Sequence, residues 1–96
     1  MLLCMRIYNW NPDKNQELIL GRNISFEEAV FYIEHRGLLD DIVHPDATEY
    51  PNQRIFIVNI KDYVYLVPYV EDENELFLKT IIPSRKFTKK YLRGGS

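Results

Sequence analysis

Apolar residues form short runs typical of strands at the start and in the second half of this chain, and a stripe at helical spacing lies between them. A short run of large residues ending at Trp10 predicts a first strand over residues 5–10. Asn11 is a favourable N-cap, and the proline and aspartate that follow it suit the first turn of a helix. We expect this helix to run to about Leu20, because Gly21 is a natural C-terminal stop.

A second helix is predicted after Ser25. Ser25 and Glu28 have the spacing of a capping box, in which each side chain satisfies a backbone N–H group of the other's residue. Apolar residues follow at helical spacing until Gly37 ends the pattern. Residues 38–51 are polar, with several acidic residues and two prolines, so we expect a connecting loop there.

Three strands are predicted in quick succession after this loop. Residues 54–60 are almost entirely apolar, which is typical of a strand covered on both faces. Lys61 and Asp62 form a tight turn, residues 63–70 make the return strand, and residues 76–82 follow an acidic turn. Connections this short require antiparallel neighbours.

A final helix that begins at Pro83 and Ser84 completes the predicted domain. The chain has 96 residues, which is room for a single hydrophobic core. We therefore expect one α+β domain over residues 1–93, with an antiparallel sheet of three to four strands, two N-terminal helices and a C-terminal helix. Residues 94–96, with the sequence Gly-Gly-Ser, are interpreted as a flexible tail or a cloning remnant.

Charge is distributed unevenly along the chain. The segment from Lys79 to Ser96 holds six basic residues and no acidic one, whereas the rest of the chain holds six basic and fourteen acidic residues. The net charge of −2 therefore conceals a basic C-terminal end. Such asymmetry predicts a localised anion-binding face rather than general adhesion to polyanions.

The N-terminal sequence and the cysteine content favour the cytoplasm. Cys4 is the single cysteine, so no intramolecular disulfide can form, as is usual in a reducing compartment. The apolar start of the chain has no basic residue before it and is interrupted by Arg6, so we reject an export signal. No apolar run is long enough to span a bilayer, and we expect no membrane partner.

Several kinds of site chemistry have little support in the sequence. His35 and His44 are the only histidines, and no cysteine or carboxylate lies at ligand spacing around them, so we expect no metal and no cofactor. Ser25 is better explained as a helix cap than as a nucleophile. With four glycines in all, the chain has no glycine-rich phosphate loop.

Basic and aromatic residues form a better candidate site. In a three-stranded meander they could converge on one face, where guanidinium groups bind phosphate and tyrosine rings stack on bases. Cleavage of RNA can proceed without a metal if cations stabilise the phosphate charge and a neighbouring group moves the 2′-hydroxyl proton. The residues in question are Arg54, Tyr65, Tyr69, Lys79, Arg85 and Lys86.

Structural explanations compete with this interpretation. Lys89, Lys90 and Arg93 fit the solvated side of the last helix. The tyrosines are typical sheet-packing residues, and Arg54 could pair with Glu49 or another acid. Lys79 interrupts an apolar strand, which indicates either protection of a sheet edge or a function.

Four segments of the chain, in this order and at this spacing, resemble the BrnT-type toxins, a branch of the RelE/ParE superfamily. Residues 8–14, Tyr-Asn-Trp-Asn-Pro-Asp-Lys, are similar to the family's opening aromatic-x-Trp-Asp-x-x-Lys. Residues 24–29, Ile-Ser-Phe-Glu-Glu-Ala, are similar to its entry into the second helix. Arg54 resembles the family's arginine after the acidic loop, and residues 81–86, Ile-Ile-Pro-Ser-Arg-Lys, resemble its Ile-Ile-Ser-Ala-Arg-Lys.

The resemblance implies a RelE/ParE-like fold and the toxin component of a type II toxin–antitoxin system. Such a toxin is a metal-independent endoribonuclease that cleaves RNA and inhibits translation. It is neutralised by a cognate antitoxin, whose DNA-binding part represses the operon, so operator DNA is reached only through the antitoxin. Carried over by position, Arg54 and Arg85 would contact the phosphate and its transition state.

The chain departs from the family pattern in two places. The family usually has Lys-His-Gly before the second-helix segment, where this chain has Gly21, Arg22 and Asn23, so the histidine's role would pass to Arg22 or stay vacant. The arginine often found before Ile-Ile is Thr80 here.

The candidate site has two parts. Its catalytic candidates are Arg54, Arg85, Lys79 and Tyr65, and its RNA-binding candidates are Lys86, Arg22, Lys89 and Tyr69. The alternative is a catalytically degenerate toxin-fold protein that acts as a protein- or nucleic-acid-binding module.

Overall fold

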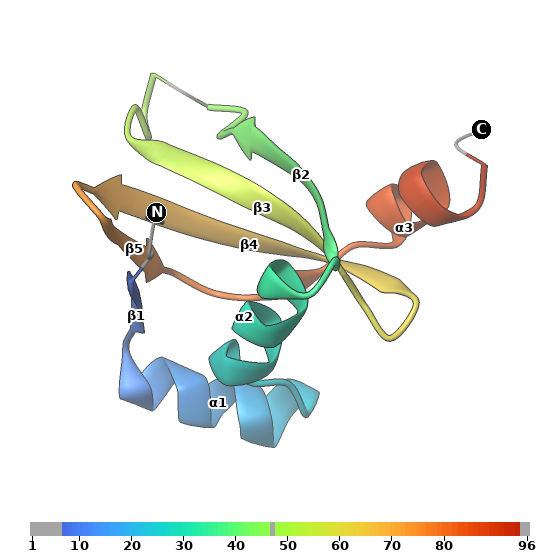
Figure 1. Cartoon of the computed structure of the whole chain (residues 1–96), viewed down its shortest axis with the longest axis horizontal. Coiled ribbons are helices and arrows are strands. Elements are labelled where there is room, and N and C mark those ends of the chain that lie inside the picture. The colour runs from blue at the N-terminus through green and yellow to red at the C-terminus, as the bar shows by residue number, and fades with distance from the viewer. Residues whose placement is uncertain (1–6, 47, 95–96) are drawn as a thin grey trace, which may run out of the picture.

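The computed structural model describes residues 7–46 and 48–94 (Figure 1). The first two residues of the predicted first strand, the apolar start with Cys4, and the end of the Gly-Gly-Ser tail lie outside these ranges. The elements along the chain are β1 (Ile7–Trp10), α1 (Pro12–Arg22), α2 (Phe26–Glu34), β2 (Leu38–Val43), β3 (Gln53–Ile60), β4 (Tyr63–Asp72), β5 (Glu75–Leu78), β6 (Ile82–Pro83) and α3 (Arg85–Leu92).

The first two helices begin at the predicted caps, and the third begins at Arg85 after Ser84, which caps it. Asn11 accepts hydrogen bonds from the backbone of residues 13 and 14, Ser25 from that of Glu28, and Ser84 from that of Phe87. The carboxylate of Glu28 does not complete the predicted capping box, because it pairs with Lys61 at 3.3 Å. In the described part of the chain, no helix has the length and apolarity needed to cross a membrane.

The helix α1 is longer than predicted. Gly21 does not stop it, and the helix continues to Arg22. The C-cap is Asn23, whose φ of 56° is left-handed and whose N–H donates back to Ile19. Asparagine tolerates this conformation better than most residues, so it can replace glycine as the terminator.

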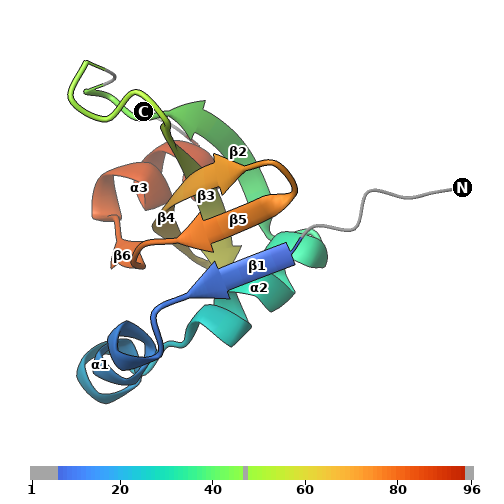
Figure 2. The ribbon, with the colours of Figure 1, turned by 90° about the vertical axis from the view of Figure 1, so that its left-hand side faces the viewer.

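The strands form one mixed sheet in the order β1-β5-β4-β3-β2, with β6 also paired to β4. β1 runs parallel to β5, and the other pairs are antiparallel. Figure 2 shows β1 and β5 side by side and pointing in the same direction. The α+β class is confirmed, but the sheet of six strands is larger than the predicted three to four.

One additional strand is β2, where a loop was predicted. It pairs with β3, and a register irregularity lies between Leu38 and Asp40. The adjacent Asp40 and Asp41 make this segment look like a loop in sequence. In the fold each carboxylate has a distant partner, since Asp40 accepts from Tyr91 at 3.0 Å and Asp41 accepts from Arg54 at 3.1 Å.

The last predicted strand is divided into β5 and β6. Both pieces follow the same edge of β4: Leu78 is opposite Tyr69, and Ile82 is opposite Leu66. Between them the chain leaves the ladder so that the side chain of Ile81 is fully buried. The predicted strand over residues 76–82 was therefore wrong at its centre.

The sheet has an apolar core on each face, because side chains alternate along β3. Phe56, Val58 and Ile60 pack with residues of α1 and α2. Ile55 and Ile57 pack on the other face with residues of α3. Figure 1 accordingly shows α1 and α2 together, with α3 set apart from them. The predicted coverage of this strand on both faces is confirmed.

Candidate functional site

Two predicted site residues, Arg54 and Tyr69, meet around a carboxylate that the sequence did not single out. They are directly opposite each other in the β3–β4 ladder, and Asp41 lies on the neighbouring β2. Arg54 Nε donates to Asp41 Oδ1 at 3.1 Å, and Arg54 Nη2 donates to the backbone oxygen of Asp41 at 3.0 Å. Arg54 therefore has an acidic partner, as one of the structural explanations anticipated, but the partner is Asp41 and not Glu49.

Tyr69 is closed off from solvent. Only 2% of its surface is exposed, and its ring stacks on Phe56 with centroids 4.0 Å apart. Burial and then the hydrogen bond to Asp41 raise the pKa of Tyr69 to about 12. Tyr69 is thus fully protonated at neutral pH, and its buried ring offers no surface on which a base could stack. The hydrogen bond to Asp41 also raises the pKa of Arg54, so this guanidinium stays charged.

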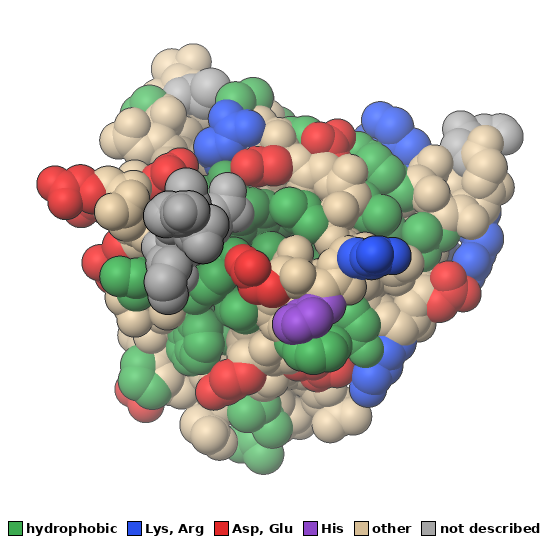
Figure 3. All heavy atoms as spheres, in the orientation of Figure 1, with side chains coloured by type: hydrophobic (Ala, Val, Ile, Leu, Met, Phe, Trp, Pro, Cys, Tyr) green, Lys and Arg blue, Asp and Glu red, His purple; other side chains and the backbone are tan. Residues whose placement is uncertain are grey.

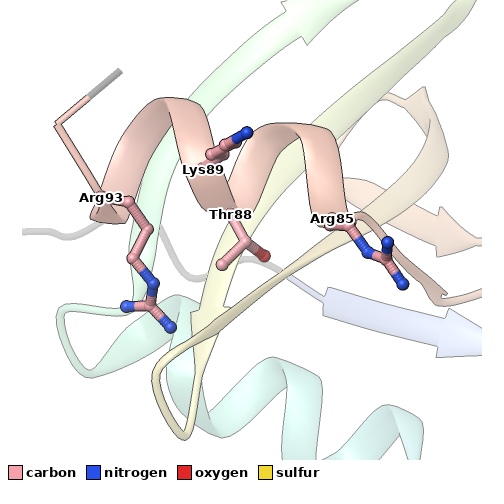
Figure 4. Close-up of a pocket in the computed structure, with 4 residues that line it drawn as sticks. All are labelled: Arg85, Thr88, Lys89 and Arg93. Carbon is pink, nitrogen blue, oxygen red and sulfur yellow. The ribbon is translucent and has the colours of Figure 1, made fainter. Parts of the chain in front are cut away.

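A second group of predicted residues lines an open hollow on α3. The hollow has a volume of about 630 Å³ and is lined by Arg85, Thr88, Lys89 and Arg93. Figure 4 shows Thr88 between the two arginines on one side of the helix. Arg85, Lys89 and Arg93 are each four residues apart, so they lie one above another at intervals of about 6 Å.

Thr88 fixes the floor of this hollow. It is 4% exposed, and its hydroxyl accepts a hydrogen bond from the backbone N–H of Val64 at 2.8 Å. The same hydroxyl donates to the backbone oxygen of Ser84 at 2.7 Å. These two bonds hold α3 against β4, so the cations around Thr88 project from a well-anchored helix.

The charges of the hollow are only partly balanced. Arg93 pairs with Asp62 at 3.7 Å. Within residues 7–46 and 48–94, no carboxylate forms an ion pair with Arg85 or Lys89. In Figure 3 most Lys and Arg side chains lie on the right, the side of α3 in Figure 1, whereas acidic side chains extend to the left margin.

Arg85 also opposes the dipole of its own helix. It is the first residue of α3, and Lys86 follows it in a first turn that contains no acidic residue. The N-terminal end of a helix carries partial positive charge, so cations there raise the free energy of the folded state unless an anion is bound. This arrangement favours binding of an anion at the start of α3.

Lys86 and Lys90 lie near the ring of Phe87 on an adjacent face of α3. Lys86 Nζ lies 6.0 Å from the ring centroid of Phe87, and Lys90 Nζ lies 5.8 Å from the same centroid. Neither of them lines the hollow. They add to the positive potential around α3 without contributing to the row of cations formed by Arg85, Lys89 and Arg93.

The other predicted residues have separate surroundings. Tyr65 packs against the core under α1 and α2. Arg22 Nη1 donates to the backbone oxygen of Ile81 at 2.6 Å, which connects the end of α1 to the break between β5 and β6. Lys79 lies over the ring of Phe77, 5.8 Å from its centroid, in a different hollow. That hollow of about 430 Å³ is lined by Val70, Asp72, Glu75, Phe77 and Lys79.

The candidate residues do not converge on one face. Arg54, Tyr65 and Tyr69 belong to the face covered by α1 and α2, whereas Arg85 and Lys89 belong to α3 on the opposite face. Lys89, Lys90 and Arg93 are exposed on the last helix, as the structural explanation anticipated, and Lys89 and Arg93 also line the hollow. No comparable signal in the sequence identified Asp41, because its segment was assigned to a loop.

The described residues include no group of three or more His, Cys, Asp or Glu side chains arranged to hold a metal ion. No protein-family model matches this chain, and neither the curated proteins nor the solved structures contain a match.

Proposed function

We propose that this protein is an RNA-binding toxin that holds the RNA backbone in the α3 hollow, cleaves it without a metal, and is neutralised by a cognate antitoxin. One observation carries the proposal: Arg85, Lys89 and Arg93 line a single open hollow of about 630 Å³. Cations in such a row bind the phosphates of a nucleic-acid strand, each acting as one contact. The four segments that resemble BrnT-type toxins support the same proposal.

Arg85 has the leading role in this proposal. It lines the hollow, and in the described structure no carboxylate pairs with it. It is also the residue that resembles the arginine of the family's C-terminal motif. As the phosphate passes to its more highly charged transition state, a guanidinium at this point would strengthen its contacts and lower the barrier.

A test compares two lysines of the same helix. Lys89→Ala removes a cation from the hollow, and Lys90→Ala removes the same charge from a neighbouring position outside the hollow. We expect Arg85→Ala and Lys89→Ala each to weaken RNA binding about ten-fold and to reduce the dependence of log K on log salt by about 0.7. Lys90→Ala should change both quantities much less. Equal effects of Lys89→Ala and Lys90→Ala would show that only general charge matters.

Cleavage is tested separately from binding. The wild-type protein should cut a labelled RNA in the presence of a metal chelator and should slow bacterial growth when expressed. Arg85→Ala should lower the cleavage rate about a hundred-fold, the effect usual for loss of one group that stabilises transition-state charge. Co-expression of a cognate antitoxin, which we expect to be a small DNA-binding protein, should restore growth. Absence of both RNA cleavage and growth arrest would refute the toxin proposal.

A second candidate function is a binding module without catalysis. It is favoured by the separation of the site residues, since Arg54, Tyr65 and Tyr69 lie on the face opposite Arg85. A group that moves the 2′-hydroxyl proton would have to come from α3 or from the RNA itself. Tight RNA binding with no cleavage and normal growth would identify this function.

A further inference from the structure

The turn between β3 and β4 has a conformation that its sequence does not favour. Lys61 and Asp62 have φ values of 54° and 68°, both in the left-handed region. A two-residue hairpin turn with positive φ at both positions is usually made by Asn-Gly or a similar pair. Lysine in particular gains nothing locally from this conformation, so the fold stabilises the turn through more distant contacts.

These contacts come from both layers of helices. Lys61 Nζ lies 3.3 Å from Glu28 Oε2 on α2, and Asp62 Oδ2 lies 3.7 Å from Arg93 Nη1 on α3. The backbone N–H of Asp62 donates to Asn59 Oδ1 at 3.0 Å, which fixes the turn further. The hairpin end is thus held between α2 and α3, with the Asp62 carboxylate presented to the last cation of the hollow.

We propose that Asp62 is a built-in competitor for phosphate at Arg93. This inference rests on the proposed function, because it assigns the hollow to a phosphate backbone. Phosphate binds first at Arg85 and Lys89, which have no ion-pair partner among the described residues, and it reaches Arg93 only by displacing Asp62. Asp62 therefore limits the affinity of the site and the number of phosphates that it holds.

The exposure of the pair makes such an exchange feasible. The Arg93 side chain is 53% exposed and that of Asp62 is 76% exposed. Ion pairs in this environment are weak and are screened by salt. The Lys61–Glu28 ion pair and the hydrogen bond from the Asp62 N–H to Asn59 Oδ1 do not involve Arg93, so they keep the turn in place and the carboxylate near Arg93 when the phosphate leaves.

Asp62→Asn is the direct test. It removes the charge, keeps nearly the same shape, and places in the turn a residue that tolerates positive φ. The probe is a fluorescent single-stranded eight-nucleotide 2′-O-methyl oligouridylate, which lacks the hydroxyl needed for cleavage. We expect affinity at low salt to rise up to about five-fold, and the slope of log K against log salt to steepen by about 0.7 as a further phosphate contact forms.

Two controls separate the specific effect from general charge. Glu71→Gln removes one negative charge from an exposed position at the other end of the hairpin strand, and it should leave the slope unchanged. In an Arg93→Ala background, Asp62→Asn should no longer change the slope, because the contact it releases is missing. An unchanged slope in Asp62→Asn, or the same steepening without Arg93, would overturn the inference.

Failure of the proposed function has a different signature. If the wild-type protein and Asp62→Asn both fail to bind the oligonucleotide at low salt, the RNA-binding proposal is refuted. The competition is then measured by titrating inorganic phosphate and following the arginine Nε–H signals by NMR. The Arg93 signal should respond at a lower phosphate concentration in Asp62→Asn than in wild type. Equal concentrations would overturn the role of Asp62.

Discussion

Tyr69 Oη donates its one proton to the carboxylate of Asp41, whose two oxygens lie 2.9 and 2.8 Å away, across the width of β3. Arg54, on β3 itself, approaches the same carboxylate from the side at 3.1 Å. Three neighbouring strands are thereby joined by one polar group. This arrangement accounts for an acidic residue in the middle of a strand, since the carboxylate exchanges water for hydrogen bonds from Tyr69 and Arg54.

Stability should fall at high pH because of Tyr69. Its pKa of about 12 in the folded protein exceeds the ordinary value of about 10 expected in the unfolded chain. As pH rises between these values, the unfolded chain loses the proton first, so the free energy of unfolding decreases by up to about 2–3 kcal/mol. Below about pH 9 both states are protonated and Tyr69 makes no pH-dependent contribution.

The matched variant for this prediction is Tyr69→Phe. It should be less stable than wild type by about 1–2 kcal/mol near neutral pH, because the Asp41 carboxylate loses the hydrogen bond from the Tyr69 hydroxyl. The wild type should lose this advantage as pH approaches about 12. Urea unfolding of both proteins across this range isolates Tyr69, since the other titrating groups are common to both. A constant difference between them would contradict the raised pKa.

Arg54→Ala should affect folding more than RNA binding. Its guanidinium is occupied by Asp41, so its loss should lower the free energy of unfolding by about 1–2 kcal/mol. Because Arg54 lies on the face opposite α3, affinity for RNA should stay within about two-fold of wild type. Arg54→Lys keeps the charge but cannot reproduce both contacts, so it should be intermediate in stability. Lost binding at unchanged stability would instead place Arg54 in the RNA site.

Thr88→Val should destabilise the attachment of α3. The substitution leaves the buried N–H of Val64 without its acceptor, at a cost of about 1–3 kcal/mol in the free energy of unfolding. Thr88→Ser keeps the hydroxyl and should retain the larger part of this stability. Denaturant unfolding, together with hydrogen exchange at the Val64 amide, measures both effects. Equal losses for Val and Ser would mean that the methyl group, not the hydrogen bond, anchors the helix.

Substitution by alanine at two glycines should change the free energy of unfolding in opposite directions. A Cβ at Gly37 would lie 2.6 Å from the Tyr32 backbone oxygen and 2.9 Å from that of Asn59, so Gly37→Ala should cost about 1–3 kcal/mol. A Cβ at Gly21, inside α1, meets no atom within 4 Å, so Gly21→Ala should stabilise the protein by about 0.5–1 kcal/mol. Thermal unfolding of both variants shows whether each is more or less stable than wild type. Stabilisation by Gly37→Ala would contradict the close packing of this turn.

Local features of this chain could be predicted from its sequence. The caps at Asn11 and Ser25 were confirmed because a capping side chain bonds to backbone only two or three residues away. The β3–β4 hairpin could also be predicted from the sequence, since its strands are apolar and its turn has two residues. The almost entirely apolar run over residues 54–60 also indicated burial on both faces, and the two cores confirm it.

The features that the sequence concealed depend on contacts between distant residues. β2 looked like a loop because Asp40 and Asp41 gain their partners only in the fold, from Tyr91 and from Arg54 and Tyr69. Arg54 and Arg85 were expected on one face. Successive residues of a strand point to opposite faces of the sheet, so the register of β3 decides the face of Arg54. The face of Arg85 depends on the side of the sheet on which its helix packs. The sequence by itself determined which residues carry charge and where each helix begins. Only the tertiary structure decided that Arg54 pairs with Asp41 while Arg85 stands in an open hollow, because register and layer order arise from long-range packing.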